Sequence, residues 1–240
     1  MKVIFTKNYE EMSKKSAQMV IDQVKSKKDS ILGLATGSTP IGLYKSLIEA
    51  HNNGLDFSQV RTFNLDEYIG LSPDNPQSYN FFMFDNLFNH INIKRENIRI
   101  PQGDTNPEEE ILQYEKEVKA AGGVDIQVLG IGPDGHIAFN EPDEELNVPT
   151  SIVHLEDSTI KANARFFESE DQVPTSAISM GMETIFSAKK IILLISGSNK
   201  DESTDYLINK NKISTKVPVS LLHLHHDVTV FIDESSVKVR

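Results

Sequence analysis

Short apolar runs alternate with amphipathic stretches along all 240 residues of the chain. The apolar runs are rich in β-branched residues and poor in charge, which is typical of strands buried on both faces of a parallel sheet. They predict strands over residues 3–5, 31–35, 60–64, 98–100, 126–131, 177–180, 191–196 and 228–232. The stretches between them repeat their apolar positions with a helical period and predict helices over residues 9–25, 41–51, 78–88, 107–120, 160–166, 182–187 and 200–208.

Polar residues mark the starts of several of these helices. Asn8, Ser78 and either Thr105 or Asn106 can accept a hydrogen bond from the first turn, and Pro107 suits the first helical position. The local chemistry therefore agrees with the apolar period about where the helices begin.

Alternating strands and helices predict an α/β fold with a doubly wound, mostly parallel sheet flanked by helices, similar to the Rossmann fold. No linker or repeat divides the chain, so we expect a single domain over residues 1–240. The segment 142–158 is long and polar for a connection within one domain. We expect a lid over a site there, within about residues 142–175.

Composition excludes several classes of protein. The net charge of -11 argues against a nucleic-acid or anionic-membrane partner, since both require a basic surface. The chain has no cysteine, so it has no disulfide, thiol nucleophile or cysteine-bound metal. The longest apolar runs are far too short to span a bilayer. We therefore expect a soluble, cytoplasmic protein.

The loop after the strand at 126–131 gathers the most reactive side chains. Asp134, His136 and Glu141 offer two acids and an imidazole within eight residues, which suits proton transfer. A lone histidine is more often structural, but flanking acids can hold one tautomer and stabilise the imidazolium. We therefore favour a catalytic role for His136.

Three glycines in the same loop match the spacing of a dinucleotide-binding turn. Gly130, Gly132 and Gly135 fit G-x-G-x-x-G, but that fingerprint must lead into a helix. Residues 140–142, Asn-Glu-Pro, break the chain soon afterwards. The sequence therefore argues against a nicotinamide cofactor.

The turn at 36–40, TGSTP, follows another predicted strand and leads into a helix. Backbone N–H groups around Gly37, with the hydroxyls of Ser38 and Thr39, could bind a phosphate at the helix N-terminus. Ordinary helix capping explains the same residues. The P-loop spacing is absent, so a nucleoside triphosphate is not indicated.

Two adjacent acids, Asp66 and Glu67, follow the strand at 60–64. Neighbouring carboxylates in a desolvated place can hold one proton between them and supply a base near neutral pH. Acids at the start of a helix or turn would complement its dipole and give the same pattern. Both interpretations remain open at this point.

Basic residues near two strand ends could balance a phosphate. Arg165 follows the expected lid, and Lys200 follows the strand at 191–196. Arginine offers a bidentate fork and lysine a mobile charge, although either could be an ordinary surface residue.

His223, His225 and His226 resemble a metal cluster, but no acid or cysteine accompanies them. We therefore predict a polar turn before a strand and no metal site.

Taken together, the motifs resemble the glucosamine-6-phosphate deaminase family, in its short bacterial type. The resemblance covers nearly the whole chain, and its motifs are LGLATGSTP at 32–40, FNLDEYIGL at 63–71, Ser78-Tyr79, GIGPDGHIAFNEP at 130–142, KANARFF at 161–167 and SGSNK at 196–200. It implies conversion of glucosamine 6-phosphate and water to fructose 6-phosphate and ammonium, with a sugar phosphate as the small-molecule partner and no cofactor or metal.

The resemblance also implies roles for particular residues. Asp66 would move the proton between C2 and C1. Its neighbour Glu67 is a candidate for support on the grounds of the acid pair alone. His136 would open the sugar ring, oriented by Asp134 and Glu141. The phosphate contacts would be Gly37, Ser38, Thr39, Arg165 and Lys200.

The chain differs from the regulated members of that family. Their basic contacts for the activator N-acetylglucosamine 6-phosphate correspond to Ser151 and Val153, which carry no charge. We therefore expect no activation by that ligand, and a monomer or small homo-oligomer in place of a hexamer.

Two alternatives come from relatives of this fold: 6-phosphogluconolactonases and sugar-phosphate-sensing domains of transcriptional regulators. A sensor would need a DNA-binding module, for which the chain has no spare length. A lactonase needs no base for a C2 proton, so Asp66 together with His136 favours the deaminase.

Overall fold

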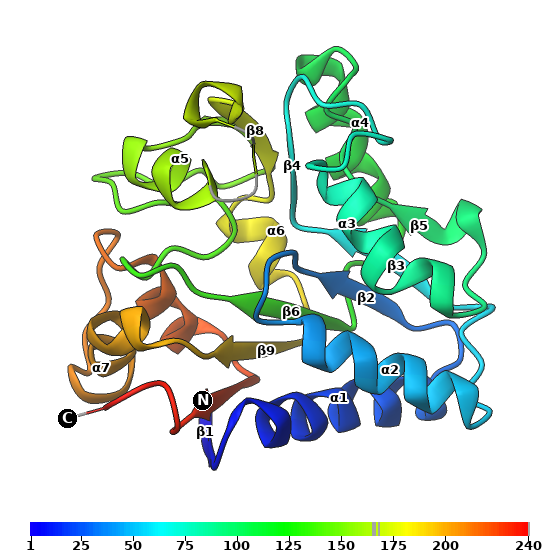
Figure 1. The fold of residues 1–240 in the computed structure, drawn as a ribbon, viewed down its shortest axis with the longest axis horizontal. Helices are drawn as coiled ribbons and strands as arrows, with labels where there is room; N and C mark the ends of the chain where they lie inside the picture. The colour runs from blue at the N-terminus through cyan, green and yellow to red at the C-terminus, as the bar shows by residue number, and fades with distance from the viewer. Residues whose placement is uncertain (165–166, 168, 240) are drawn as a thin grey trace.

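The main sheet of the protein is parallel throughout, in the order β1–β10–β9–β6–β2–β3–β5 (Figure 1). The structure is a computed structural model that describes residues 1–164, 167 and 169–239. The strands are β1 (Lys2–Thr6), β2 (Ile31–Leu34), β3 (Arg61–Asn64), β5 (Ile98–Arg99), β6 (Ile126–Gly130), β9 (Lys190–Ile195) and β10 (Val228–Asp233). Each lies where an apolar run predicts a strand, so the predicted α/β fold is confirmed.

Side chains that alternate along each strand fill two separate cores. On β9, Ile191, Leu193 and Ile195 join one core, whereas Ile192 and Leu194 join the other. Helices cover both faces, with α1 and α2 below the sheet in Figure 1 and α4 above it. Their bounds are α1 (Tyr9–Ser26), α2 (Ile41–Asn52), α3 (Tyr79–Asn86), α4 (Pro107–Ala120), α5 (Asp157–Asn163), α6 (Met182–Phe186) and α7 (Asp201–Asn209).

Three helix starts carry the predicted caps. The side chains of Asn8, Ser78 and Asn106 accept backbone hydrogen bonds from the first turns of α1, α3 and α4. Pro107 occupies the first turn of α4. Of the two residues considered for α4, Asn106 is the cap. Such caps contribute about 1 kcal/mol each.

A second, smaller sheet stands over the first and was not expected from the apolar pattern. It pairs β4 (Asp66–Tyr68), β8 (Ser176–Ser179) and β7 (Ser151–His154) in antiparallel fashion, in the order β4–β8–β7. The strand predicted at 177–180 therefore belongs here and not to the parallel sheet. Asp66 and Glu67 lie within a strand, which corrects the alternative of a helix or turn start.

The chain reverses its direction across the main sheet between β2 and β6. From β2 it adds β3 and β5 on one side, then returns to β6 on the other side and continues outward to β9 and β10. Ligands of doubly wound sheets bind at such a switch point, beyond the carboxyl ends of the strands. The loops after β2, β3, β6 and β9 therefore surround the expected binding place.

Shorter helical turns connect these elements. They are η1 (Phe88–His90), η2 (Arg95–Asn97), η4 (Glu170–Gln172), η5 (Ser198–Lys200) and η6 (Pro218–Leu224). Among the described residues, none of the helices is long and apolar enough to cross a membrane.

The histidines near the C-terminus form the polar turn that precedes β10. His223 Nε2 lies 2.8 Å from Leu207 O, and His225 Nε2 lies 2.8 Å from Ala188 O. His225 Nδ1 also accepts a hydrogen bond from the backbone N–H of Asp227. Within the described ranges, no three side chains of His, Cys, Asp or Glu are placed to hold a metal ion.

Candidate active site

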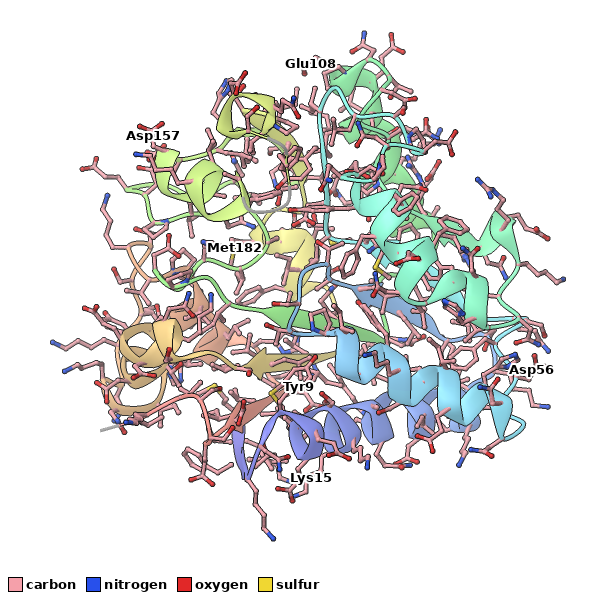
Figure 2. The ribbon with its side chains drawn as sticks, in the orientation of Figure 1. Tyr9, Lys15, Asp56, Glu108, Asp157 and Met182 are labelled. Atoms are coloured by element: carbon pink, nitrogen blue, oxygen red, sulfur yellow. The ribbon has the colours of Figure 1, made fainter. Side chains whose placement is uncertain are left out.

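One tyrosine, Tyr9, holds the loop after β2 through its hydroxyl. The hydroxyl of Tyr9, labelled in Figure 2, lies 3.1 Å from Ser38 O and 3.0 Å from Thr39 O, and it accepts a hydrogen bond from Gly42 N. Gly37 has φ +93°, a conformation that glycine adopts without strain. The loop enters α2 directly, so its backbone N–H groups lie at a helix N-terminus.

The loop after β6 holds a close pair of an acid and an imidazole. His136 Nδ1 lies 2.8 Å from Asp134 Oδ1, and the same oxygen accepts the backbone N–H of His136. Burial acts to raise the pKa of Asp134, but the hydrogen bonding and charge of His136 outweigh it and leave that pKa lowered. Asp134 is therefore ionised at neutral pH and can orient the ring.

Glycines shape this loop as expected, although not for a dinucleotide. A β-carbon on Gly132 would lie 2.1 to 2.5 Å from atoms of the His136 ring, so the ring packs on bare backbone. Gly135 has φ +88°. No helix follows within the next ten residues, which confirms that the fingerprint lacks the context it needs.

Glu141 contacts a different part of the site. Its carboxylate accepts hydrogen bonds from the backbone N–H of Glu156 at 3.0 Å and from the hydroxyl of Thr159. These groups belong to the N-terminal end of α5, inside the expected lid. Of the two acids, only Asp134 pairs with His136 in the described part of the chain, so direct orientation of the ring by Glu141 is not seen here.

Asp66 is the most perturbed acid of the site. Only 6% of the residue is exposed, and no Lys, Arg or His of the described ranges lies within 4.0 Å of its carboxylate. Burial first, and the nearby charge of Glu67 second, raise the pKa of Asp66 to about 8. A carboxyl with such a pKa can both accept and return a proton near neutral pH.

Strand β8 brings the two reactive segments together. Ser179 pairs with Asp66 across the small sheet, and its hydroxyl accepts the backbone N–H of Phe139 at 3.1 Å. Asn140 Nδ2 donates to Met180 O at 2.8 Å. The loop that carries His136 is therefore hydrogen-bonded to β8, the strand that pairs with Asp66. Nothing in the sequence pattern predicts this role of Ser179, because it depends on the unexpected second sheet.

An aromatic cluster reinforces the same junction. Tyr68, two residues beyond Asp66, packs against Tyr79 at the start of α3 with ring centroids 4.7 Å apart. Phe139 stacks on Tyr79 at 6.2 Å and packs on Tyr68 at 6.0 Å. The cluster therefore joins β4, the start of α3 and the loop after β6 through packed rings.

The two basic candidates are placed differently. Lys200 lies in η5 after β9, next to the end of β6 in the sheet order, and is half-buried. Arg165 lies outside the residues that the structure describes. Of the predicted site residues, Gly37, Ser38, Thr39, Asp66, Glu67, Asp134, His136, Glu141 and Lys200 all follow carboxyl ends of neighbouring strands or pack beside them.

A doubly wound sheet with a buried acid and an acid–imidazole pair at its switch point defines an α/β enzyme that binds small ligands beyond its strand ends. The chain belongs to the family of glucosamine-6-phosphate isomerases and 6-phosphogluconolactonases, whose model matches residues 6–231.

Similar proteins support this membership. The chain is 58% identical to a glucosamine-6-phosphate deaminase of Thermoanaerobacter sp. (strain X514), over 98% of this chain and 94% of that protein. It is 48% identical to a monomeric glucosamine-6-phosphate deaminase of known structure, with a TM-score of 0.95 and 98% of each chain covered. The resemblance inferred from the motifs is confirmed.

The lactonase branch is similar in fold only. A 6-phosphogluconolactonase from Thermotoga maritima is 18% identical, with a TM-score of 0.75 over 96% of this chain and 98% of that one. This difference in similarity favours the deaminase branch over the lactonase alternative.

Proposed function

We propose that the protein is a glucosamine-6-phosphate deaminase, which converts glucosamine 6-phosphate and water to fructose 6-phosphate and ammonium. The observation that carries the proposal is a buried carboxyl with a raised pKa, Asp66, fastened through β8 to the loop that holds the His136–Asp134 pair. High identity to deaminases over nearly the full chain supports the same reaction.

Ring opening comes first, because the C2 proton becomes acidic only beside a free aldehyde. His136 would take the proton of the anomeric hydroxyl and deliver it to the ring oxygen, so that the bond between C1 and the ring oxygen breaks as the C1 carbonyl forms. Asp134 holds the imidazole at 2.8 Å and carries the charge that stabilises an imidazolium. Glu141 would support this step indirectly, by joining the loop to the start of α5.

Isomerisation then moves one proton. The ionised carboxylate of Asp66 would take the proton from C2, and the C–H electrons would form the C1–C2 double bond while the aldehyde oxygen takes a proton from the C2 ammonium group, which gives an enolamine. Return of the proton from Asp66 to C1 gives an iminium at C2, and addition of water there releases ammonium and leaves the ketone. The substrate is neither oxidised nor reduced overall, so the reaction requires no redox cofactor.

Phosphate binding falls to the rim of the site. The turn at Gly37, Ser38 and Thr39 offers backbone N–H groups and hydroxyls at the start of α2. Lys200 at the end of β9 would supply positive charge, and Arg165 is the second cation proposed by motif. A phosphate bound here would leave the C1 and C2 end of the sugar for Asp66.

We also propose that the protein works as a monomer. A relative that is 48% identical over nearly the whole chain is monomeric. Sedimentation at micromolar concentration would give one species near the chain mass of 26.9 kDa, whereas a stable hexamer would contradict this part of the proposal.

The substrate assignment is tested by offering the pure protein two compounds side by side. Glucosamine 6-phosphate should release ammonium in a time- and enzyme-dependent manner, while hydrolysis of 6-phosphogluconolactone stays at its spontaneous rate. Lactone hydrolysis without ammonium release would favour the lactonase alternative. Binding of glucosamine 6-phosphate without turnover would favour a non-catalytic sensor.

A further inference from the structure

Glu67 is the most heavily hydrogen-bonded acid near the proposed base. Only 2% of the residue is exposed, yet its carboxylate accepts three backbone N–H groups. Oε1 accepts those of Tyr68 and Tyr79 at 2.9 Å, and Oε2 accepts that of Asn80 at 2.8 Å. No basic side chain of the described ranges lies within 4.0 Å of it.

These contacts complete the first turn of α3. Tyr79 and Asn80 are its first two residues, so Glu67 satisfies two N–H groups that have no partner inside the helix. Ser78 accepts the next one, from Phe81, through its hydroxyl, and the one from Phe82 through its carbonyl. Glu67 therefore ties β4 to the positive end of the α3 dipole.

Asp66 and Glu67 are neighbours in β4, so their side chains leave opposite faces of the strand. Glu67 holds the strand from one face and leaves the carboxylate of Asp66 on the other. The pairing of Asp66 with Ser179 fixes the register at the same point. The strand is thus held on both sides of the proposed base.

We propose that Glu67 is a positioning residue of the reaction: its carboxylate fixes the β4 strand against the first turn of α3 and so holds the neighbouring Asp66 in place. The inference rests on the proposed function, since it concerns the same proton transfer.

Apart from Glu67, the titratable groups of the described residues that interact with Asp66 are uncharged phenols. The other titratable groups that sense Asp66 are the phenols of Tyr44 from α2, Tyr79 from α3 and Tyr114 from α4, and burial raises the pKa of each, so all are neutral at working pH. Burial raises the pKa of Glu67 itself to about 7, with Asp104 adding to the rise and the three backbone N–H donors opposing it. Glu67 is therefore ionised near pH 8, where Asp66 titrates, and Glu67→Gln removes that charge.

The test separates charge from position with two variants. Glu67→Gln keeps one acceptor oxygen, which can serve the Tyr68 and Tyr79 N–H groups, loses the acceptor of the Asn80 N–H, and removes the charge. The acidic limb of the kcat/KM profile should therefore move down by roughly one pH unit. Glu67→Asp keeps the charge but shortens the reach, so kcat should fall roughly tenfold to a hundredfold with the limb unmoved. The substrate titrates identically in every variant, and its contribution cancels.

Glu115→Gln is the matched control. Glu115 accepts hydrogen bonds from Thr150 N, Thr150 Oγ1 and Thr184 Oγ1, so this variant also weakens a network around a carboxylate. Its acidic limb should coincide with that of the wild type. The proposal would be overturned if the acidic limb of the kcat/KM profile moved equally in Glu115→Gln. It would also be overturned if that limb stayed at its wild-type pH in a folded Glu67→Gln.

A second measurement, by infrared spectroscopy, does not depend on turnover. The infrared difference between each protein and its Asp66→Asn counterpart isolates the carboxylate band of Asp66. That band should titrate at lower pH in Glu67→Gln than in wild type. If Glu67→Gln does not fold, Glu67→Asp decides, because unchanged kcat there would refute the positioning role. If the wild type releases no ammonium, the proposed function is refuted. The infrared titration still tests the effect of Glu67 on Asp66 in that case.

Discussion

The imidazole of His136 packs on the bare backbone of Gly132, with ring atoms 2.1 to 2.5 Å from where a β-carbon would stand. A methyl group at that position cannot coexist with the ring as placed. The conformation of the proposed ring-opening group therefore depends on a glycine four residues earlier in the chain.

Gly132→Ala should displace His136 and lower kcat by roughly a hundredfold, the order expected when an acid–base group moves by about 1 Å. Steady-state rates of ammonium release give the measurement. Gly130→Ala, two residues earlier at the end of β6, is the control, because nothing lies within 4 Å of its added carbon. Equal activity of the two variants would mean that the placement of His136 is not required.

Asp66→Asn should abolish the C2 proton transfer and reduce kcat by roughly a hundredfold to ten-thousandfold. The amide is similar in size, so the fold should persist, as circular dichroism would verify. Full turnover by Asp66→Asn would remove Asp66 from the role of base and leave the overall reaction standing.

The same variant should be more stable than the wild type above about pH 5. The pKa of Asp66 is raised in the folded protein, so the unfolded chain releases this proton near pH 4 and the folded protein keeps it until about pH 8. Wild-type stability is therefore lost progressively as the pH rises through this window. The Tm difference between Asp66→Asn and wild type should grow from pH 5 to pH 8, and a constant difference would show that burial does not perturb this carboxyl.

Asp134→Asn should lower kcat by roughly tenfold or more, as part of the hundredfold to ten-thousandfold that general acid–base groups contribute. The amide can still hold the ring but no longer stabilises its positive charge. Asp22→Asn, on the exposed face of α1, makes the same change of charge and should keep full activity. Indistinguishable rates for the two variants would separate Asp134 from the reaction.

N-acetylglucosamine 6-phosphate should not raise the rate at subsaturating glucosamine 6-phosphate. The positions that the family resemblance matches to the phosphate contacts of that activator are Ser151 and Val153 on β7, and neither is charged. The Ser151 hydroxyl donates to Pro149 O at 2.9 Å. A clear rise in initial rate on adding this ligand would contradict the expectation.

The parallel sheet could be predicted from the sequence because doubly buried strands give continuous apolar runs with helical stretches between them. The small sheet could not. Its strand β4 is Asp-Glu-Tyr, and acids are unfavourable in strands unless the tertiary structure compensates them. Here the hydrogen bonds of Glu67 to α3 provide that compensation, and they join residues twelve and thirteen positions apart.

The site residues could be named from their loops, but their partners could not. The link from Asp66 through Ser179 to Phe139 joins three segments far apart in the chain. The contact of Glu141 with Glu156 and Thr159 differs from the expected contact with His136, because α5 offers closer hydrogen-bond donors. Whether residues 142–175 close over a bound sugar stays a prediction.

The central claim is most directly tested by following glucosamine 6-phosphate that carries deuterium at C2. The wild type should release ammonium and fructose 6-phosphate in equal amounts, with the deuterium recovered at C1 or in water, while Asp66→Asn leaves the C2 label in place. Loss of the C2 deuterium from the substrate by Asp66→Asn at the wild-type rate, or no ammonium from the wild type, would contradict the account.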